Sequence, residues 1–262
     1  MNLSLTNKFA VVCGSSQGLG LAAAVELASL GANCILLARN KDSLEKALSS
    51  LPDNGSQQHS YAIADFSDTA AVQTAIQKIV AEQNVEILVN NTGGPKAGLI
   101  MDAGSEDFLN AFQQHLINNR NLVEAVLPGM KSTGYGRIIN IISTSVKTPL
   151  PNLGVSNTIR AAVAAWAKSL SNEVGQYNIT VNNVLPGLTA TARLSSLISG
   201  TAEKSNQRIE DVEQGMIGSI PMKRFGEAAE IANVIAFLAS PAASYITGVS
   251  IPVDGGRTPT LS

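Results

Sequence analysis

Residues 9–31 read FAVVCGSSQGLGLAAAVELASLG, and this stretch decides the fold. A short apolar run at residues 9–12 is followed by a glycine-rich loop and then by an apolar helical pattern. A continuously apolar run indicates a strand buried on both faces, because a strand with one face in water alternates apolar and polar residues. The stretch therefore predicts a buried strand, a tight turn and a helix that packs on the same sheet.

The alternation of short apolar runs and longer helical patterns continues along the chain. Strands are expected at residues 9–12, 34–38, 61–64, 86–90, 137–142, 179–184 and 249–253, and helices near 18–30, 41–50, 67–82, 105–131, 152–175 and 227–239. This rhythm predicts an α/β fold, a doubly wound (Rossmann) parallel sheet of about seven strands with helices on both faces. No linker is apparent, so residues 1–262 are expected to form a single domain. Residues 189–220 carry no strand signal and predict a lid or substrate loop, with a mobile surface excursion as the alternative.

Composition excludes several classes of protein. Hydrophobic residues make up 45% of the chain and charged residues 15%, which excludes a disordered protein. The formal net charge of −2 provides no basic field, so neither a nucleic-acid partner nor a membrane partner is expected. The apolar runs are too short to span a bilayer, and the N-terminus has no secretory leader pattern. Cys13 and Cys34 lack metal-ligand spacing, so we expect a buried reduced pair, no metal site and a cytoplasmic location.

The glycine-rich loop GSSQGLG at residues 14–20 lies between the first strand and the first helix. Glycines allow the backbone to approach a pyrophosphate, and the helix N-terminus offers unpaired N–H groups and a positive dipole end. The placement predicts a dinucleotide site, with an ordinary strand-to-helix turn as the alternative. The expected contacts in this loop are Gly14, Ser16, Gln17, Gly18, Leu19 and Gly20.

The tip of the second strand indicates which dinucleotide is preferred. Arg39 lies 39 − 20 = 19 residues beyond Gly20, where NAD-binding folds of this type carry an acidic residue on the ribose. A guanidinium at this place suits a 2′-phosphate through charge-assisted hydrogen bonds. The sequence therefore predicts NADP(H) in preference to NAD(H), unless Arg39 is simply a solvated surface side chain.

Several motifs in order resemble those of the short-chain dehydrogenase/reductase family, nearest to its β-ketoacyl-carrier-protein reductase branch. Residues 13–20 resemble the TGxxxGIG loop, residues 90–93 (NNTG) resemble NNAG, residues 186–191 resemble PG-x-x-x-T, and residues 220–226, 245–248 and 253–256 resemble the C-terminal signatures. The match runs from about Lys8 to Gly256. It implies a small-molecule carbonyl or alcohol substrate and a homotetramer, with helix packing through the Ala-rich residues 161–167. The cofactor contacts that it adds are Asn40, Asp65, Phe66, Asn91, Thr92, Gly93, Arg160, Pro186, Gly187, Thr189 and Thr191.

The family's catalytic set is Asn, Ser, Tyr and Lys, and this chain departs from it. Ser143 matches the serine, but Ser156 stands where tyrosine is expected, Arg160 where lysine is expected and His115 where asparagine is expected. None of the four tyrosines of the chain is placed to replace the missing phenol. An aliphatic hydroxyl is a far weaker acid than a phenol. Arg160 can still donate to ribose hydroxyls but is expected to take no part in proton relay.

Several residues are candidates for the missing acid. His115 has an ordinary pKa of about 6.5, which fits acid–base work, and the alternative is a buried histidine bonded to backbone. Lys96 is either a proton donor, a holder of an acidic substrate or a solvated side chain. Arg193 could bind an anion, and Ser143 and Ser156 could polarise a carbonyl with water as the acid. Two hypotheses follow: an NADP(H)-dependent oxidoreductase with a remodelled proton path, or a redox-inactive NADP(H)-binding sensor, scaffold or partner subunit.

Overall fold

Seven parallel strands form one sheet in the order β3-β2-β1-β4-β5-β6-β7 within residues 1–260, the part of the chain that the computed structural model describes. The strands are β1 (Phe9–Cys13), β2 (Asn33–Ala38), β3 (Ser60–Ile63), β4 (Ile87–Asn90), β5 (Gly136–Ile141), β6 (Ile179–Pro186) and β7 (Ser250–Val253). The sequence places all seven within a few residues of these bounds. The order confirms the doubly wound parallel sheet, in which the direction of winding reverses between β1 and β4.

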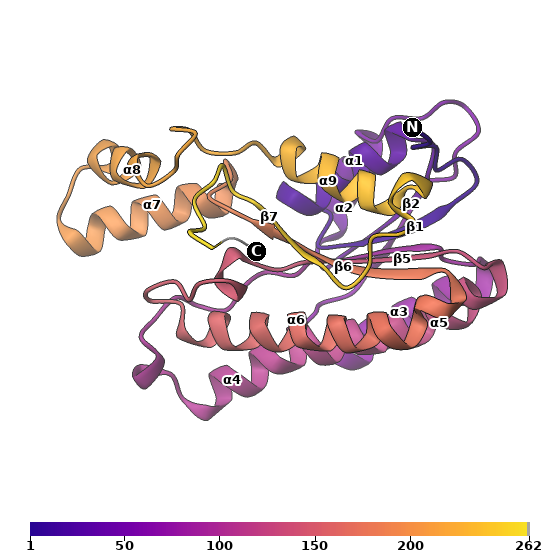
Figure 1. The fold of residues 1–262 in the computed structure, drawn as a ribbon, viewed down its shortest axis with the longest axis horizontal. Helices are drawn as coiled ribbons and strands as arrows, with labels where there is room; N and C mark the ends of the chain where they lie inside the picture. The colour runs from indigo at the N-terminus through magenta and orange to yellow at the C-terminus, as the bar shows by residue number, and fades with distance from the viewer. Residues whose placement is uncertain (261–262) are drawn as a thin grey trace.

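Helices cover both faces of the sheet (Figure 1). One face carries α1 (Gly18–Ser29), α2 (Lys41–Ser49) and α9 (Ala228–Ala239), and the other carries α3 (Thr69–Glu82), α5 (Asn118–Thr133) and α6 (Gly154–Val174). Short 3₁₀ turns lie at η1 (Ile100–Asp102), η3 (Thr144–Val146), η4 (Gly175–Tyr177) and η5 (Pro241–Ala243). The two largest clusters of buried aliphatic side chains lie one on each face, as the continuous apolar strands require.

The single helix expected at residues 105–131 is wrong. The structure has α4 (Ser105–Phe112), a π-helical turn η2 (Gln113–Ile117) and then α5. The backbone N–H of Asn118 donates to the carbonyl of Gln113, five residues earlier, so one extra residue enters the turn. Such π turns concentrate at functional sites, and this one contains His115.

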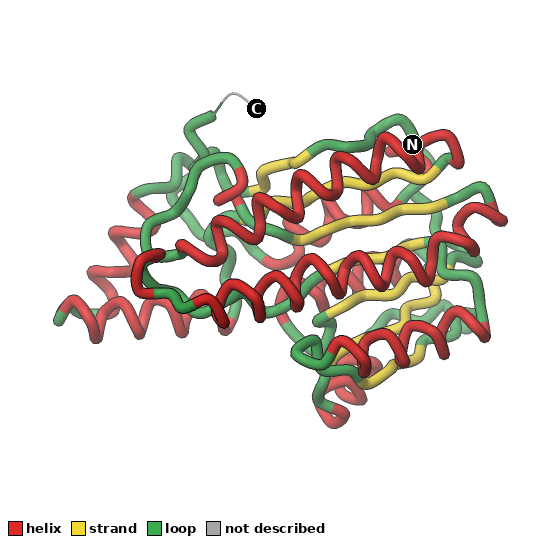
Figure 2. The backbone as a smooth tube through the Cα atoms, turned by 90° about the horizontal axis from the view of Figure 1, so that it is seen from below, coloured by secondary structure: helices red, strands yellow, loops and turns green. Residues whose placement is uncertain are grey.

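The expected lid is helical. Within residues 189–220 lie α7 (Ala192–Ser205) and α8 (Ile209–Gly218), which extend beyond the sheet at the end where β6 finishes (Figures 1 and 2). These two helices share a small apolar cluster of their own that contains Leu194, Ile198 and Val212. The segment is therefore an ordered helical pair that projects from the sheet.

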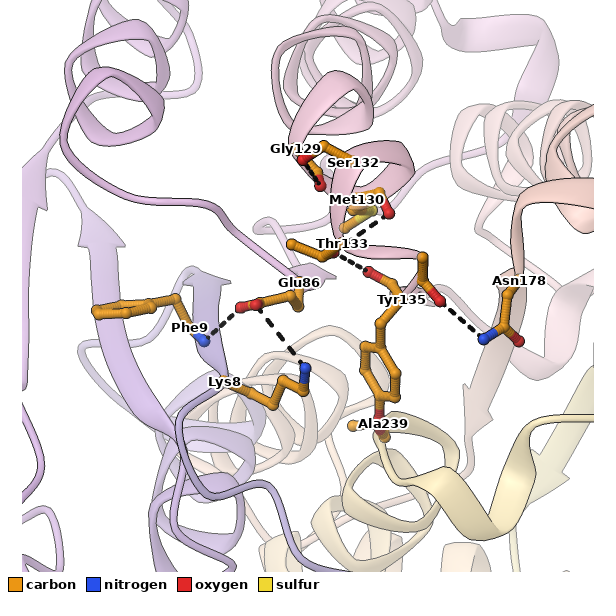
Figure 3. Close-up of polar contacts among 11 residues, drawn as sticks. Lys8, Phe9, Glu86, Gly129, Met130, Ser132, Thr133, Tyr135, Asn178 and Ala239 are labelled. Atoms are coloured by element: carbon orange, nitrogen blue, oxygen red, sulfur yellow. Dashed lines mark hydrogen bonds and ion pairs between the residues drawn. The ribbon is translucent and has the colours of Figure 1, made fainter.

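The polar cluster of Figure 3 lies at the amino-terminal ends of the strands, opposite the end from which α7 and α8 project. The Tyr135 hydroxyl donates to the carbonyl of Ala239 at 2.6 Å, and the Lys8 ammonium lies 4.5 Å from the Tyr135 ring centroid. Glu86 accepts a hydrogen bond from the backbone N–H of Phe9 at 2.8 Å and pairs with Lys8 at 3.9 Å. Tyr135 therefore lies at the amino edge of the sheet, as its position in the sequence predicts.

Both cysteines are buried and free, as expected from the sequence, and no disulfide joins them. They do not form a pair, because Cys13 ends β1 in one apolar cluster whereas Cys34 begins β2 in the other. Burial raises the pKa of each thiol to about 12. Among the described residues, no helix is long and apolar enough to cross a membrane, and no group of three or more His, Cys, Asp or Glu side chains could hold a metal.

Candidate active site

The carboxyl ends of β1, β4, β5 and β6 meet at one edge of the sheet, beside the point where the winding reverses. Ligands of doubly wound folds bind in the crevice at this place. The loops that follow these four strands carry the glycine-rich loop, residues 90–93, Ser143 and residues 186–191. The topology therefore collects at one edge the motifs that the sequence separates by more than a hundred residues.

The glycine-rich loop is closed tightly against the end of β4. A Cβ atom on Gly20 would collide with the Gly14 backbone, so only glycine fits there. The Asn91 amide donates to the carbonyls of Cys13 and Gly14 at 3.3 Å each and holds the loop in place. Gln17, the N-cap of α1, makes no side-chain capping bond, and the first turn contains no acid. The free N–H groups of this turn fit the diphosphate of a dinucleotide.

The end of β2 brings Arg39 next to Asp65. Arg39 is exposed and directly follows the strand. Hydrogen bonds from Ser67, together with the nearby charge of Arg39, lower the pKa of Asp65. Asn40 uses its side-chain oxygen to accept from the Ser43 backbone at 2.8 Å and so caps α2. The guanidinium of Arg39 thus lies on the open surface beside the aspartate that the resemblance places at the adenine.

The segment after β6 is fixed by its own side chains. Thr189 donates to the carbonyl of Gly187 at 3.2 Å, and Thr191 donates to the carbonyl of Thr189 at 3.2 Å. The Thr191 hydroxyl also accepts from the backbone of Leu194 at 3.4 Å, which caps α7. Pro186 is the last residue of β6. This turn therefore connects the sheet edge rigidly to the first helix of the lid.

Two serines and one arginine come from the loop after β5 and from the first turns of α6. Ser143 is half-buried, and its oxygen accepts from the backbone of Ser145 at 3.1 Å, which leaves its hydrogen free to donate. Ser156 and Arg160 are buried one turn apart on α6. Arg160 is 7% exposed and donates from Nη1 to the carbonyl of Ile141 at 3.0 Å. Burial first, and then the charge of Arg193, lower the pKa of Arg160 to about 10, so it stays charged at neutral pH.

His115 lies in the π turn and is 3% exposed. Its Nδ1 lies 2.6 Å from the Thr92 hydroxyl oxygen, whereas its Nε2 has no partner among residues 1–260. Burial first, and then the charges of Arg160 and Arg193, lower its pKa to about 3. The imidazole is therefore neutral at physiological pH, and its hydrogen bond goes to a side chain and not to the backbone.

A set of buried amides near this edge was not predicted from the sequence. Asn90 donates to Asn140, Asn140 donates to Asn183, and both bonds are 2.9 Å long. Asn183 donates to the Ser250 hydroxyl at 3.0 Å, which completes a row across β4, β5, β6 and β7. The strand register brings these four residues together. A polar residue within each of these otherwise apolar strands was the signal that could have revealed the row.

Asn118 was also missed. It is fully buried, three residues after His115, and its amide donates to the carbonyl of Phe66 at 2.7 Å. Its side-chain oxygen has no partner within the described chain. Helical spacing from His115 could have identified it, because residues three apart share one side of a helix.

The remaining candidates lie away from this edge or on its surface. Lys96 and Gly93 are exposed, and Lys96 has no hydrogen bond or ion pair in the part of the chain that the structure describes. The Tyr61 hydroxyl donates to Glu45, and Tyr245 is 102% exposed before β7. Tyr177 lies beneath Lys131 before β6 begins. Within residues 1–260, no tyrosine reaches the carboxyl edge of β4, β5 or β6.

Comparisons with known proteins cover nearly the whole chain. Residues 14–258 match the family model of enoyl-(acyl carrier protein) reductase. The chain is 32% identical to the NADPH-dependent reductase BacG of Bacillus subtilis (strain 168), over 98% of this chain and 100% of that protein. It is 34% identical to the 3-oxoacyl-(acyl-carrier-protein) reductase FabG of Pseudomonas aeruginosa, over 97% and 98% of the two chains. The solved structure of L-sorbose reductase from Gluconobacter frateurii with NADPH and L-sorbose superposes with a TM-score of 0.93 at 31% identity, over 100% of both chains.

Proposed function

Because this chain belongs to the short-chain dehydrogenase/reductase family, we propose that it is an NADP(H)-dependent oxidoreductase that interconverts a carbonyl compound and an alcohol through a remodelled proton path. The observation that carries the proposal is the meeting of three features at one sheet edge. These are the closed glycine-rich loop, the free Ser143 hydroxyl, and the buried α6 face with Ser156 and Arg160.

The cofactor site supports a dinucleotide with a 2′-phosphate. The uncapped first turn of α1 would bind the diphosphate, and Arg39 would bind the 2′-phosphate. Asp65 would contact the adenine ring. Asn91 and Thr191 would fix the loops on either side of the nicotinamide half. When bound, NADPH supplies a hydride for carbonyl reduction. BacG is named as an NADPH-dependent reductase, and the L-sorbose reductase structure contains NADPH. Both facts are consistent with a preference for NADP(H) over NAD(H).

The proton path is assigned to hydroxyls and water. Ser143 and Ser156 donate hydrogen bonds to the carbonyl oxygen, and water supplies the proton that converts it to the alcohol. His115 is neutral, so it contributes a hydrogen-bonding Nε2 for such a water and not an imidazolium proton. Arg160, charged and held by the Ile141 carbonyl, orients the ribose hydroxyls of the nicotinamide half.

Two further features belong to this proposal. Residues 189–220 act as the substrate lid of the single domain 1–262, because α7 and α8 project from the edge where the site lies.

The chain assembles as a homotetramer, supported by the outward alanines Ala161 and Ala165 on α6, which permit close helix packing. Light scattering at micromolar concentration should give four times the mass of one chain, and a monomer would contradict this assembly.

The direct test incubates the pure protein with NADPH and a panel of ketones, β-ketoesters, quinones and aldehydes. We expect oxidation of NADPH with at least one carbonyl compound, and a strong loss of kcat in Ser143→Ala at unchanged NADPH affinity. His115→Ala and Lys96→Ala are measured in parallel. Turnover that both variants leave intact would remove both residues as proton donors.

The alternative function is a redox-inactive NADP(H)-binding sensor, scaffold or partner subunit. The observation that favours it is the lack of any tyrosine at this edge within residues 1–260. Tight NADPH binding without oxidation on any substrate of the panel would support this alternative over the enzyme.

A further inference from the structure

Two arginines share the candidate site without a carboxylate partner. Arg160 is buried on α6, and its Nε has no hydrogen-bond partner among residues 1–260. Arg193 is the second residue of α7 and is exposed, and it takes part in none of the ion pairs or side-chain hydrogen bonds of the described residues. The two charges act on the same group of residues, because Arg193 lowers the pKa of Arg160 and both arginines lower the pKa of His115.

The guanidinium of Arg193 lies over the backbone of Gly94, just after the Asn90–Gly93 segment. A Cβ atom built on Gly94 would lie 2.7 Å from Nη1 of Arg193 and 2.9 Å from its Cζ. The arginine, although exposed to solvent, therefore bridges from the lid to the loop after β4. Glycine at position 94 is what allows this close approach.

A buried cation beside a second cation is costly unless an anion joins them. Neither guanidinium forms an ion pair with an acidic side chain of the described residues. An anion carried by a ligand would therefore be the first to join them. Arginine pairs with carboxylates through two parallel hydrogen bonds, which suits it to hold an anionic ligand in one orientation.

We propose that Arg160 and Arg193 bind the carboxylate of the substrate, so that this protein acts on oxo acids or hydroxy acids in preference to neutral carbonyl compounds. The inference rests on the proposed oxidoreductase function and names its substrate class. The cofactor's own anions have other partners, since the free first turn of α1 suits the diphosphate and Arg39 suits the 2′-phosphate. A guanidinium carries five N–H donors, so Arg160 can hold the ribose hydroxyls and still share a substrate carboxylate with Arg193.

The test compares 2-, 4- and 5-oxohexanoate with their methyl esters, in which a neutral ester replaces the charged carboxylate and the rest of the molecule is unchanged. We expect kcat/KM for at least one acid to exceed that of its ester by tenfold or more, as charge-assisted hydrogen bonds provide. Arg193→Gln should reduce this ratio about tenfold, mainly through KM for the acid, with the Kd for NADPH unchanged. Arg208→Gln is the matched control, because this lid arginine is exposed and paired with Glu210 and Asp211, and it should keep the wild-type ratio.

Binding is measured separately with hexanoate and methyl hexanoate, which cannot be reduced, by calorimetry on the NADPH complex. If no carbonyl compound is reduced but hexanoate binds in a manner that depends on Arg193, the enzyme proposal fails and the anion site stands. Equal kcat/KM for acids and esters would overturn the inference while leaving the oxidoreductase intact. An Arg193→Gln variant that weakens NADPH and keeps the acid-to-ester ratio would assign Arg193 to the cofactor and also overturn it, as would hexanoate that does not bind.

Discussion

Replacing His115 with asparagine should change how the stability of this protein depends on pH. Burial, with the charges of Arg160 and Arg193, lowers the pKa of His115 to about 3, below its ordinary value of about 6.5. Between these two values the unfolded chain binds a proton at His115 that the folded chain does not. Stability therefore falls as the pH is lowered through this window, and is fully present only above the ordinary pKa.

The size of the effect follows from the two pKa values. Lowering the pH from 7 to 5 should cost the wild type about 2 kcal/mol through His115 alone. The His115→Asn variant has nothing to protonate there, and asparagine is the residue that the family resemblance places at this position. The difference in free energy of unfolding between the wild type and the variant should shift by that amount, toward the variant, over these two pH units.

Urea unfolding at equal protein concentration measures this difference at each pH. Thr92→Val is the matched control, because it removes the hydrogen bond to Nδ1 but leaves His115 buried. Burial is the largest cause of the lowered pKa, so this control should keep most of the pH dependence. Parallel stability curves for the wild type and His115→Asn would refute the neutral buried histidine.

Three further substitutions test other parts of the molecule. Arg39→Ser should raise the Kd for NADPH about tenfold or more and leave that for NADH unchanged in equilibrium titrations; equal effects on both would deny a role at the 2′-phosphate. Asn140→Ala should lower the free energy of unfolding by about 2–4 kcal/mol, because it leaves a buried donor on Asn90 and a buried acceptor on Asn183 unpaired. A loss within the error of the urea fits would show that water takes over the hydrogen bonds of the Asn140 amide. Tyr135→Phe should cost about 1 kcal/mol in the same assay without changing NADPH affinity, since its hydroxyl bonds Ala239 at the far edge of the sheet.

The sheet was predictable because each strand is a continuous apolar run, and a parallel sheet buried on both faces is the arrangement that such runs favour. The glycine-rich loop was predictable for a local reason, since Gly14 and Gly20 must lie in contact there. The π turn was not, because the buried positions in and just after it are the polar residues His115, Asn118 and Asn119, so the hydrophobic pattern does not mark it. The protonation state of His115 could not be predicted from the sequence either, since its pKa depends on burial and on arginines that follow it by 45 and 78 residues.

The two arginines and the neutral histidine depend on one another, which gives the site a response to its ligand. Their charges help to keep His115 unprotonated. A carboxylate bound between them would neutralise part of that charge and remove a cause of the lowered pKa, so the pKa of His115 should rise on binding. The chain has only 2 histidines, and the His115→Asn variant assigns their imidazole signals in an NMR titration. Saturating hexane-1-sulfonate, which stays anionic at this acidic midpoint whereas hexanoate would be protonated, should move the His115 midpoint upward in the wild type but not in Arg193→Gln. An unchanged midpoint in the wild type, with the sulfonate bound, would place the anion away from the arginines and break the connection between ligand charge and the protonation of His115.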